Sequence, residues 1–248
     1  QVNRLAVLAL FAAVGCGPGG NPNAKPLAEL EAATRAFDRA VGLSTAFVTV
    51  GNIDTGATPA IIAGAILNRV QSEAAGCVNA SSSDATVHAD FGAGCALATA
   101  SMHAGGTVDV AVAPDMTTGG VTITLALAIT VDGAPLAGAL VLSTANGNSF
   151  TYASDGLTVG GTTAAAPLLT AGIAAGGATL DAAQATANGA ALVLAAVHER
   201  FAACYPDEGT AKLGALGVTF ASDTPQTGAI TLSTGATATL PLRAGCPK

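Results

Sequence analysis

The amino-acid sequence predicts a mainly β protein, in which an antiparallel, sandwich-like meander of strands follows two N-terminal helices. Over residues 121–131, large aliphatic residues alternate with Thr or Ala, which is typical of a strand with one buried face. Three turn dipeptides follow closely, Asp132-Gly133, Asn146-Gly147 and Asp155-Gly156, and such dipeptides favour hairpins. Helical spacing of apolar residues is confined to the first third of the mature chain.

The composition excludes two broad classes. Half of the 248 residues are hydrophobic, 10% are charged, and the mean hydropathy is +0.55. Intrinsic disorder needs low hydrophobicity and high net charge, so it does not fit. Nine basic residues face sixteen acidic ones, and no basic run occurs. Because nucleic-acid binding relies on basic patches, no nucleic-acid partner is expected.

The chain begins with a short export signal. Arg4 precedes an uninterrupted apolar run over residues 5–14. A helix of that length, rising about 1.5 Å per residue, covers only half of a hydrocarbon layer about 30 Å thick. The run therefore indicates a signal peptide and not a membrane-spanning helix.

The end of this run, Ala13-Val14-Gly15-Cys16, resembles the lipobox of bacterial lipoproteins. The resemblance implies that residues 1–15 are a removable lipoprotein signal peptide and that Cys16 becomes an acylated N-terminus, with the membrane as its partner. Several acyl chains would hold the protein stably on a membrane, whereas one chain anchors marginally. Gly17 is not Asp, which by resemblance to the enterobacterial sorting rule implies the outer membrane of the cell envelope. The alternative is an ordinary signal peptide with an incidental Cys16.

Residues 16–25 predict a flexible tether, because Gly, Pro and Asn dominate them and cannot bury a face. A helical segment is expected at 26–76. Its first helix is predicted from Pro26 to Gly42 and its second from Thr58-Pro59 to Gly76. The helical spacing is carried by Leu27, Leu30, Ala33, Phe37 and Val41 in the first, with Glu29, Glu31, Arg35, Asp38 and Arg39 on other faces, and by Ile62, Ile66, Leu67 and Val70 in the second.

From residue 77 to residue 248 an antiparallel β domain is expected. Besides the strand at 121–131, strands are predicted at Thr86 to Phe91, Thr107 to Ala113, Leu136 to Ser143, Ser149 to Ala153, Leu157 to Val159, Leu180 to Thr186, Ala215 to Phe220, Ala229 to Ser233 and Thr237 to Leu242. The run at 190–203 fits either a helix or a strand, and its neighbours favour a strand.

Four cysteines remain besides Cys16, an even number that favours disulfides in an exported chain. Of the three possible connectivities, proximity in the sequence favours Cys77 with Cys95 and Cys204 with Cys246. A metal site is the rival interpretation, but no C-x-x-C pair occurs and the spacings match no zinc module. No cofactor is expected.

Few motifs point to catalysis. His198-Glu199-Arg200-Phe201-Ala202 begins like the zinc-protease motif H-E-x-x-H, but Ala202 stands where the second histidine ligand is required. No nucleophile elbow, phosphate-binding loop or dinucleotide-binding loop is present in the sequence.

Two weaker clusters stay open as hypotheses. His88, Asp90 and His103 lie near one another in the sequence, and the first two would share a strand face, which would suit half of a metal or acid–base site. The segment from Tyr205 to Gly209 contains adjacent carboxylates in a predicted turn and is a candidate for Ca²⁺ binding. Both patterns are more often ordinary solvated or hydrogen-bonded positions.

Two cysteine motifs carry a second resemblance. The stretch Asp90-Phe91-Gly92-Ala93-Gly94-Cys95 and the later Cys204-Tyr205-Pro206-Asp207-Glu208-Gly209-Thr210 are similar to segments of uncharacterised, strand-rich bacterial envelope lipoproteins. The likeness spans about residues 85–246. It implies an architecture and a location, and no activity.

Together these observations predict a lipid-anchored cell-envelope protein with a structural or interaction role and an envelope protein or glycan as its partner. One alternative is an envelope hydrolase or other enzyme with a site assembled from dispersed His, Asp and Glu residues. Another is an adhesive or glycan-binding β module, although glycan sites usually want aromatic platforms, which are scarce here. Convergence of the three histidines in one pocket would favour the enzyme.

Overall fold

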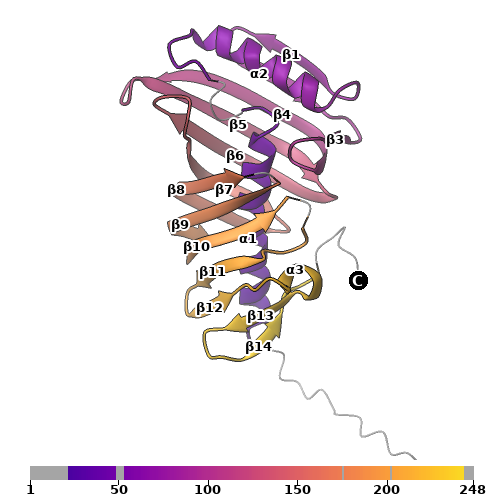
Figure 1. The fold of residues 1–248 in the computed structure, drawn as a ribbon, viewed down its shortest axis with the longest axis vertical. Coiled ribbons are helices and arrows are strands. Elements are labelled where there is room, and N and C mark those ends of the chain that lie inside the picture. The colour runs from indigo at the N-terminus through magenta and orange to yellow at the C-terminus, as the bar shows by residue number, and fades with distance from the viewer. Residues whose placement is uncertain (1–21, 49–52, 175, 202, 243–248) are drawn as a thin grey trace, which may run out of the picture.

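The structure is a computed structural model that describes residues 22–48, 53–174, 176–201 and 203–242. Over these ranges the chain forms one antiparallel sheet of fourteen strands and three helices, so the predicted mainly β fold is confirmed. The helices are α1 (Ala24–Ser44), α2 (Pro59–Glu73) and the short α3 (Thr224–Thr227). The strands are stacked along the longest axis of an elongated molecule (Figure 1).

Successive strands of the sheet are neighbours in space, in the order β1-β2-β4 and then onward to β14, while β3 pairs with β4. The strands are β1 (Asn79–Ser83), β2 (Thr86–Asp90), β3 (Cys95–Leu97), β4 (Met102–Asp115), β5 (Gly120–Val131), β6 (Ala134–Thr144), β7 (Thr151–Val159), β8 (Thr162–Ala174), β9 (Gly177–Ala187), β10 (Ala190–Arg200), β11 (Glu208–Leu213), β12 (Leu216–Thr219), β13 (Ala229–Leu232) and β14 (Thr237–Thr239). A meander is therefore present. The expected sandwich is wrong, because the described strands all belong to this one sheet and helices cover its apolar face.

Strand β5 shows why this sequence forms the sheet. Ile123 and Leu125 are fully buried, and the residues that alternate with the buried aliphatic ones along the strand are Thr or Ala that face outward. Pairing with β4 and β6 runs along almost the whole strand without a register shift. The predicted alternation and the Asp132-Gly133 turn are confirmed, since Asp132 and Gly133 have the positive φ angles of such a hairpin turn.

Helix α1 lies inside the curve of the sheet. It contacts strands β6 to β11, and Figure 1 shows it running along the long axis, across the strands. All residues from Ala32 to Ser44 are buried, whichever face of the helix they occupy. Arg35, Asp38 and Arg39 are at most 6% exposed, although the sequence places them away from the apolar stripe. The sheet encloses those faces as well, so α1 is a core element of the fold.

Gly42 does not end this helix, contrary to the prediction. The helix continues through Gly42 to Ser44, and Gly42 is not among the glycines with a positive φ angle. A Cβ atom at Gly42 would overlap Met102 and crowd the ring of Phe201. The glycine instead permits close contact between α1 and residues that lie at the ends of β4 and β10.

Arg39 joins α1 to two distant parts of the sheet. Its Nη1 donates a hydrogen bond to the Phe201 carbonyl oxygen at 2.6 Å, and its Nη2 donates to the Ala203 carbonyl oxygen at 3.3 Å. The same Nη2 lies 3.5 Å from Oδ2 of Asp132, in the turn between β5 and β6. The buried guanidinium therefore holds the segment after β10 and the β5–β6 turn at one point of the helix.

Helix α2 covers the other end of the sheet. It packs on β1, β2 and β4, and Ile62, Ile66 and Val70 form its buried stripe. The helix begins at Pro59 as predicted and stops at Glu73, before Gly76. The core is continuous from α2 through the sheet to α1.

The dipeptide Asp155-Gly156 is not a turn, contrary to the prediction. It lies within β7, where the pairing registers with β6 and β8 both shift. The Ser154 hydroxyl donates to the Ala139 carbonyl oxygen at 2.7 Å and accepts the Gly156 N–H at 3.1 Å. These bonds satisfy a β-bulge, so the strands predicted at 149–153 and 157–159 are parts of a single strand.

Several other strands differ from the prediction. The ambiguous run at 190–203 is confirmed as a strand over Ala190–Arg200. Strands β1, β3, β8 and β11 are not predicted from the sequence. Strand β8 has few large aliphatic residues and contains Pro167, so its pattern resembles a loop.

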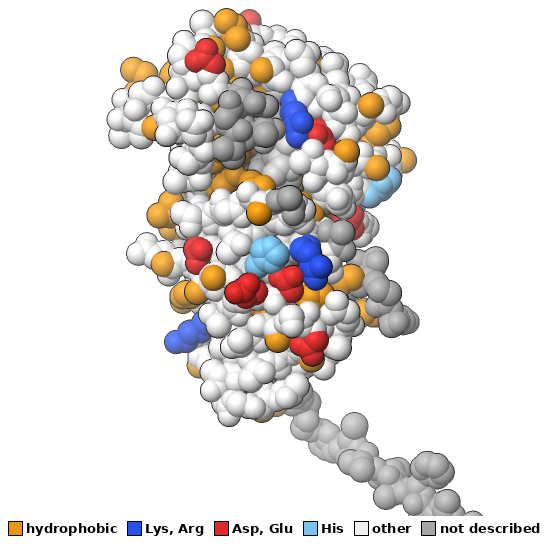
Figure 2. All heavy atoms as spheres, in the orientation of Figure 1, with side chains coloured by type: hydrophobic (Ala, Val, Ile, Leu, Met, Phe, Trp, Pro, Cys, Tyr) orange, Lys and Arg blue, Asp and Glu red, His pale blue; other side chains and the backbone are white. Residues whose placement is uncertain are grey.

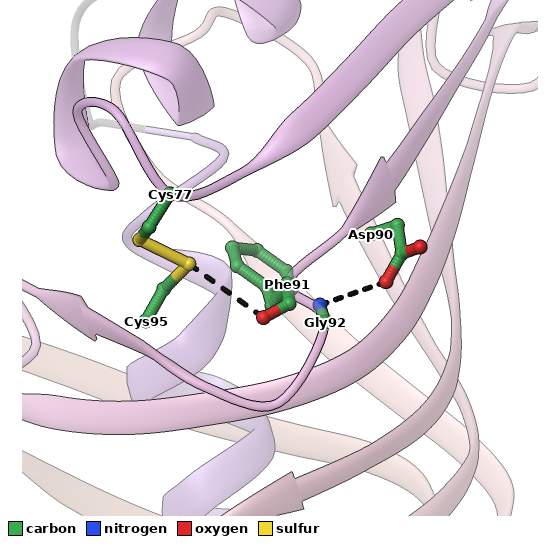
Figure 3. Close-up of a disulfide and its surroundings, with 5 residues drawn as sticks. All are labelled: Cys77, Asp90, Phe91, Gly92 and Cys95. Atoms are coloured by element: carbon green, nitrogen blue, oxygen red, sulfur yellow. Dashed lines mark hydrogen bonds between the residues drawn. A yellow bond between two sulfur atoms is a disulfide. The ribbon is translucent and has the colours of Figure 1, made fainter.

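Cys77 and Cys95 form a disulfide, as predicted, with their Cα atoms 5.8 Å apart. Figure 3 shows that it joins the segment after α2 to the start of β3, beside the turn at Phe91 and Gly92. That turn is closed by the Gly92 N–H, which donates to the Asp90 carboxylate at 2.8 Å. Cys204 also takes part in a disulfide, and its predicted partner Cys246 lies outside the described residues.

Cys16 and the predicted signal peptide likewise lie outside the described residues. Among the helices that the structure does describe, none is both long and apolar enough to cross a membrane.

Candidate functional site

The structure places the three histidines on separate strands with different acidic neighbours. His88 on β2 lies with its Nδ1 2.7 Å from Oδ1 of Asp109 on β4, and both side chains are more than half exposed. Asp90 does not join His88, since its carboxylate accepts the Gly92 N–H. This pair borders a shallow groove of about 320 Å³ on the outer surface of the sheet.

His103 meets neither of these residues. Its backbone N–H donates to Oδ1 of Asp132 at 2.9 Å, and its imidazole packs against Gly94. The predicted cluster of His88, Asp90 and His103 is therefore not assembled in the structure.

His198 on β10 forms a third, separate group. Its Nδ1 lies 2.5 Å from Oδ1 of Asp207, and Nε of Arg200 lies 3.1 Å from the other oxygen of that carboxylate. Figure 2 shows a histidine next to acidic and basic side chains near the middle of the face in view. The Asp207 carboxylate, a proposed Ca²⁺ ligand, is thus engaged by two side chains, while Glu208 begins β11.

Across the described ranges, no group of three or more His, Cys, Asp or Glu side chains is arranged to hold a metal ion. The histidine pairs are therefore best described as separate polar contacts on the strands that carry them.

A pocket of about 220 Å³ lies where α1 ends, between the helix and the sheet. It is lined by Thr45, Val48, Thr99, Leu142, Phe150, Tyr152, Ile173, Ala174, Gly176 and Phe201. Val48, Leu142, Tyr152 and Phe201 are buried and form its depth, whereas Thr99, Ala174 and the 36% exposed Ile173 lie toward its mouth. These residues come from six separate parts of the chain.

Aromatic side chains are concentrated in this pocket. The whole sequence has seven Phe, two Tyr and no Trp, and three of these nine residues, Phe150, Tyr152 and Phe201, line it. Aromatic walls with few polar groups are typical of small-molecule sites. In a chain so poor in aromatics, this gathering distinguishes the pocket from the other hollows of the surface.

Tyr152 is the one ionisable residue among the lining residues, and it is 3% exposed. Burial raises the pKa of its phenol above the ordinary value of 10.0, while a hydrogen bond with the Ser44 side chain acts in the opposite direction. The phenol is therefore neutral at physiological pH. It supplies a hydroxyl without a charge.

A polar network borders the mouth of the pocket and ties α2 to its wall. Oε1 of Glu73 lies 2.8 Å from Nη2 of Arg69 and accepts the Thr99 hydroxyl at 2.5 Å. Oε2 of Glu73 accepts the Thr99 N–H at 2.8 Å. Arg69 also donates to the Thr45 carbonyl oxygen and to the Thr99 hydroxyl. These bonds position Thr45 and Thr99. The opposite charges of Arg69 and Glu73 offset each other.

The arrangement is suited to binding, because the lining offers apolar surface and neutral hydroxyls. None of the ten lining residues is predicted from the sequence as a site residue. One signal was present, since Phe150 and Tyr152 stand two residues apart in a chain with few aromatics. Thr45 and Phe201 line the pocket because of how the sheet encloses α1, and no local sequence pattern predicts that enclosure.

No family model, curated protein or solved structure matches this chain. The site is therefore interpreted from its own geometry.

Proposed function

We propose that the protein is a lipid-anchored cell-envelope protein with an interaction role, and that the pocket at the end of α1 is its binding site. The observation that carries the binding role is the gathering of three of nine aromatic residues around an apolar pocket with neutral polar groups. The anchor is supported by the lipobox-like sequence Ala13-Val14-Gly15-Cys16.

The position of the pocket in the fold fits an anchored binding protein. The proposed anchor at Cys16 precedes α1 by a few residues, and α1 has 21 residues. At about 1.5 Å per residue, the pocket at its C-terminal end lies about 30 Å from its first turn. An acylated Cys16 would therefore attach the protein near the first turn of α1, with the pocket at the opposite end of the helix.

The alternatives receive less support. An enzyme with a site of converging histidines is not favoured, because His88, His103 and His198 each have a different acidic neighbour. The groove beside His88 is not favoured as a glycan site, because it has no aromatic side chain in its lining.

The anchor is tested by Cys16→Ala in the full chain expressed with its leader in a bacterial host. We expect the unmodified protein in the outer-membrane fraction and its N-terminal peptide to carry acyl chains in mass spectrometry. The variant is expected to lose both properties, and Gly17→Ser, which keeps the cysteine, is the matched control. Retention of the Cys16→Ala variant in the membrane fraction through an acyl-independent attachment would refute the anchor.

The binding role is tested by titrating the purified full chain with naphthalene, against a protein-free blank in the same detergent. We expect saturable binding at one site. Ala174→Phe, at the mouth of the pocket, should abolish it, whereas Ala183→Phe, at an exposed position of β9 outside the pocket, should not. If naphthalene does not bind to the unmodified chain, the proposed binding role is wrong.

A further inference from the structure

The size of the pocket limits what it can hold. Its volume is about 220 Å³. An apolar protein cavity of about 150 Å³ accommodates benzene, so a volume about 1.5 times larger suits a body of two fused rings or an equally compact aliphatic group. Phe150 and Phe201 provide flat apolar walls for such a body.

The charges around the pocket disfavour an ionic ligand. None of the lining residues carries a charge at neutral pH. The charged side chains Arg69 and Glu73 lie 2.8 Å apart and both bind Thr99, which lines the pocket. A charged ligand group entering the pocket would lose its hydration without finding a counter-ion, which is costly.

The Tyr152 hydroxyl is a hydrogen-bond acceptor for the ligand. Tyr152 is a buried member of the lining, and the Ser44 hydroxyl donates its one hydrogen to the Val41 carbonyl oxygen at 2.6 Å. A phenol hydroxyl has one donor and two acceptor sites. The Tyr152 oxygen then keeps a lone pair for an incoming N–H or O–H.

We infer that the pocket takes an uncharged, mostly hydrocarbon ligand about the size of two fused rings, with one hydroxyl or N–H group that donates a hydrogen bond to Tyr152. The inference rests on the proposed binding role and adds the chemical class of the ligand. An aromatic alcohol is the simplest member of this class.

Three naphthalene derivatives of similar size test the class on the unmodified full chain. 2-Naphthol offers a hydroxyl donor, 2-methoxynaphthalene keeps the oxygen without the donor, and naphthalene-2-sulfonate carries a charge. The absence of Trp from the chain leaves the fluorescence of these probes free of protein background at long wavelength. We expect 2-naphthol to bind about tenfold more tightly than the ether, as one satisfied hydrogen bond implies, and the sulfonate to bind more weakly than either.

Tyr152→Phe tests the assigned partner. It should lower the affinity for 2-naphthol by about tenfold, to that of the ether, and leave the affinity for the ether unchanged. Equal affinities for 2-naphthol and the sulfonate in the unmodified chain would overturn the inference even if naphthalene binds. Failure of naphthalene itself would instead reject the proposed binding role, so the two failures are distinguishable.

Discussion

Replacement of Arg39 is the strongest test of how the sheet encloses α1. Arg39→Met keeps much of the apolar stem and removes the guanidinium. The change deletes the donors to the Phe201 and Ala203 carbonyl oxygens, at 2.6 and 3.3 Å, and the contact with Asp132 at 3.5 Å. Arg39 is 5% exposed, so water does not readily replace these bonds.

The expected loss follows from those contacts. A hydrogen bond from a charged donor contributes about 1.5–3 kcal/mol, and the longer of the two lies at the low end. The pair with Asp132 adds less than about 1 kcal/mol, because that carboxylate is 30% exposed. We therefore expect Arg39→Met to lower the free energy of unfolding by about 3–5 kcal/mol, in the range found for breaking buried ion pairs.

Urea denaturation with the disulfides intact measures this loss. Asp132→Asn is the matched control, since it removes the charge, tolerates the positive φ angle and keeps an acceptor for the His103 N–H. It should lose less than about 1 kcal/mol. A loss below about 1 kcal/mol for Arg39→Met would refute the view that its hydrogen bonds hold the segment after β10 to the helix.

Three further predictions concern stability. Replacing Cys77 and Cys95 with Ala should lower the free energy of unfolding by about 3 kcal/mol, because the disulfide closes a loop with a sequence separation of 18. Calorimetry should then show a Tm lower by about 6–12 °C, and an unchanged Tm would contradict this prediction. Gly138→Ala should lower the free energy of unfolding by about 2–4 kcal/mol in denaturant titrations, because Gly138 has φ of 124° and a Cβ atom would overlap the Gly156 carbonyl oxygen. Gly156→Ala, the control, should lower it by less than about 1 kcal/mol. Equal losses for the two variants would reject the bulge geometry. Burial raises the pKa of Tyr152 above 10.0, so its contribution to stability is fully present below that pH and is lost as the pH rises through the higher folded-state pKa. Tyr152→Phe should therefore lose less stability at alkaline pH than the unmodified protein. Identical alkaline stability profiles for the two proteins would disprove this prediction.

The sheet could be predicted in part because the sequence signals of its central strands lie within each strand and its adjoining turn. The alternation at 121–131 and the Asp132-Gly133 dipeptide depend on one strand and one turn, and both are confirmed. Asp155-Gly156 has the same turn chemistry but forms a bulge, because Gly138 on the paired strand leaves room for the Gly156 carbonyl oxygen. A dipeptide does not contain that information.

The enclosure of α1 could not be predicted from its sequence. Arg35, Asp38 and Arg39 are charges of the kind that a surface helix exposes, and the helical spacing indicates only one apolar stripe. The Arg39 guanidinium is satisfied by carbonyl groups after β10 and by a turn between β5 and β6, which are more than ninety residues away in the sequence. The same long-range enclosure brings Thr45 beside Phe201 and creates the pocket.

The disulfide shows what spacing alone can and cannot supply. Proximity in the sequence selected Cys77 with Cys95 from three connectivities, and the structure confirms that pair. The pairing of Cys204 with Cys246 stays a prediction. Peptide mapping without reduction is its test, and a free thiol at Cys246 would contradict it.

The central claim is that the pocket at the end of α1 is a binding site for a small uncharged ligand. A crystal structure of the protein soaked with 2-naphthol tests it most directly. We expect ordered ligand density between Phe150 and Phe201, with the naphthol oxygen within hydrogen-bond distance of the Tyr152 hydroxyl. Clear density for the ligand elsewhere on the protein, with the pocket empty, would contradict it.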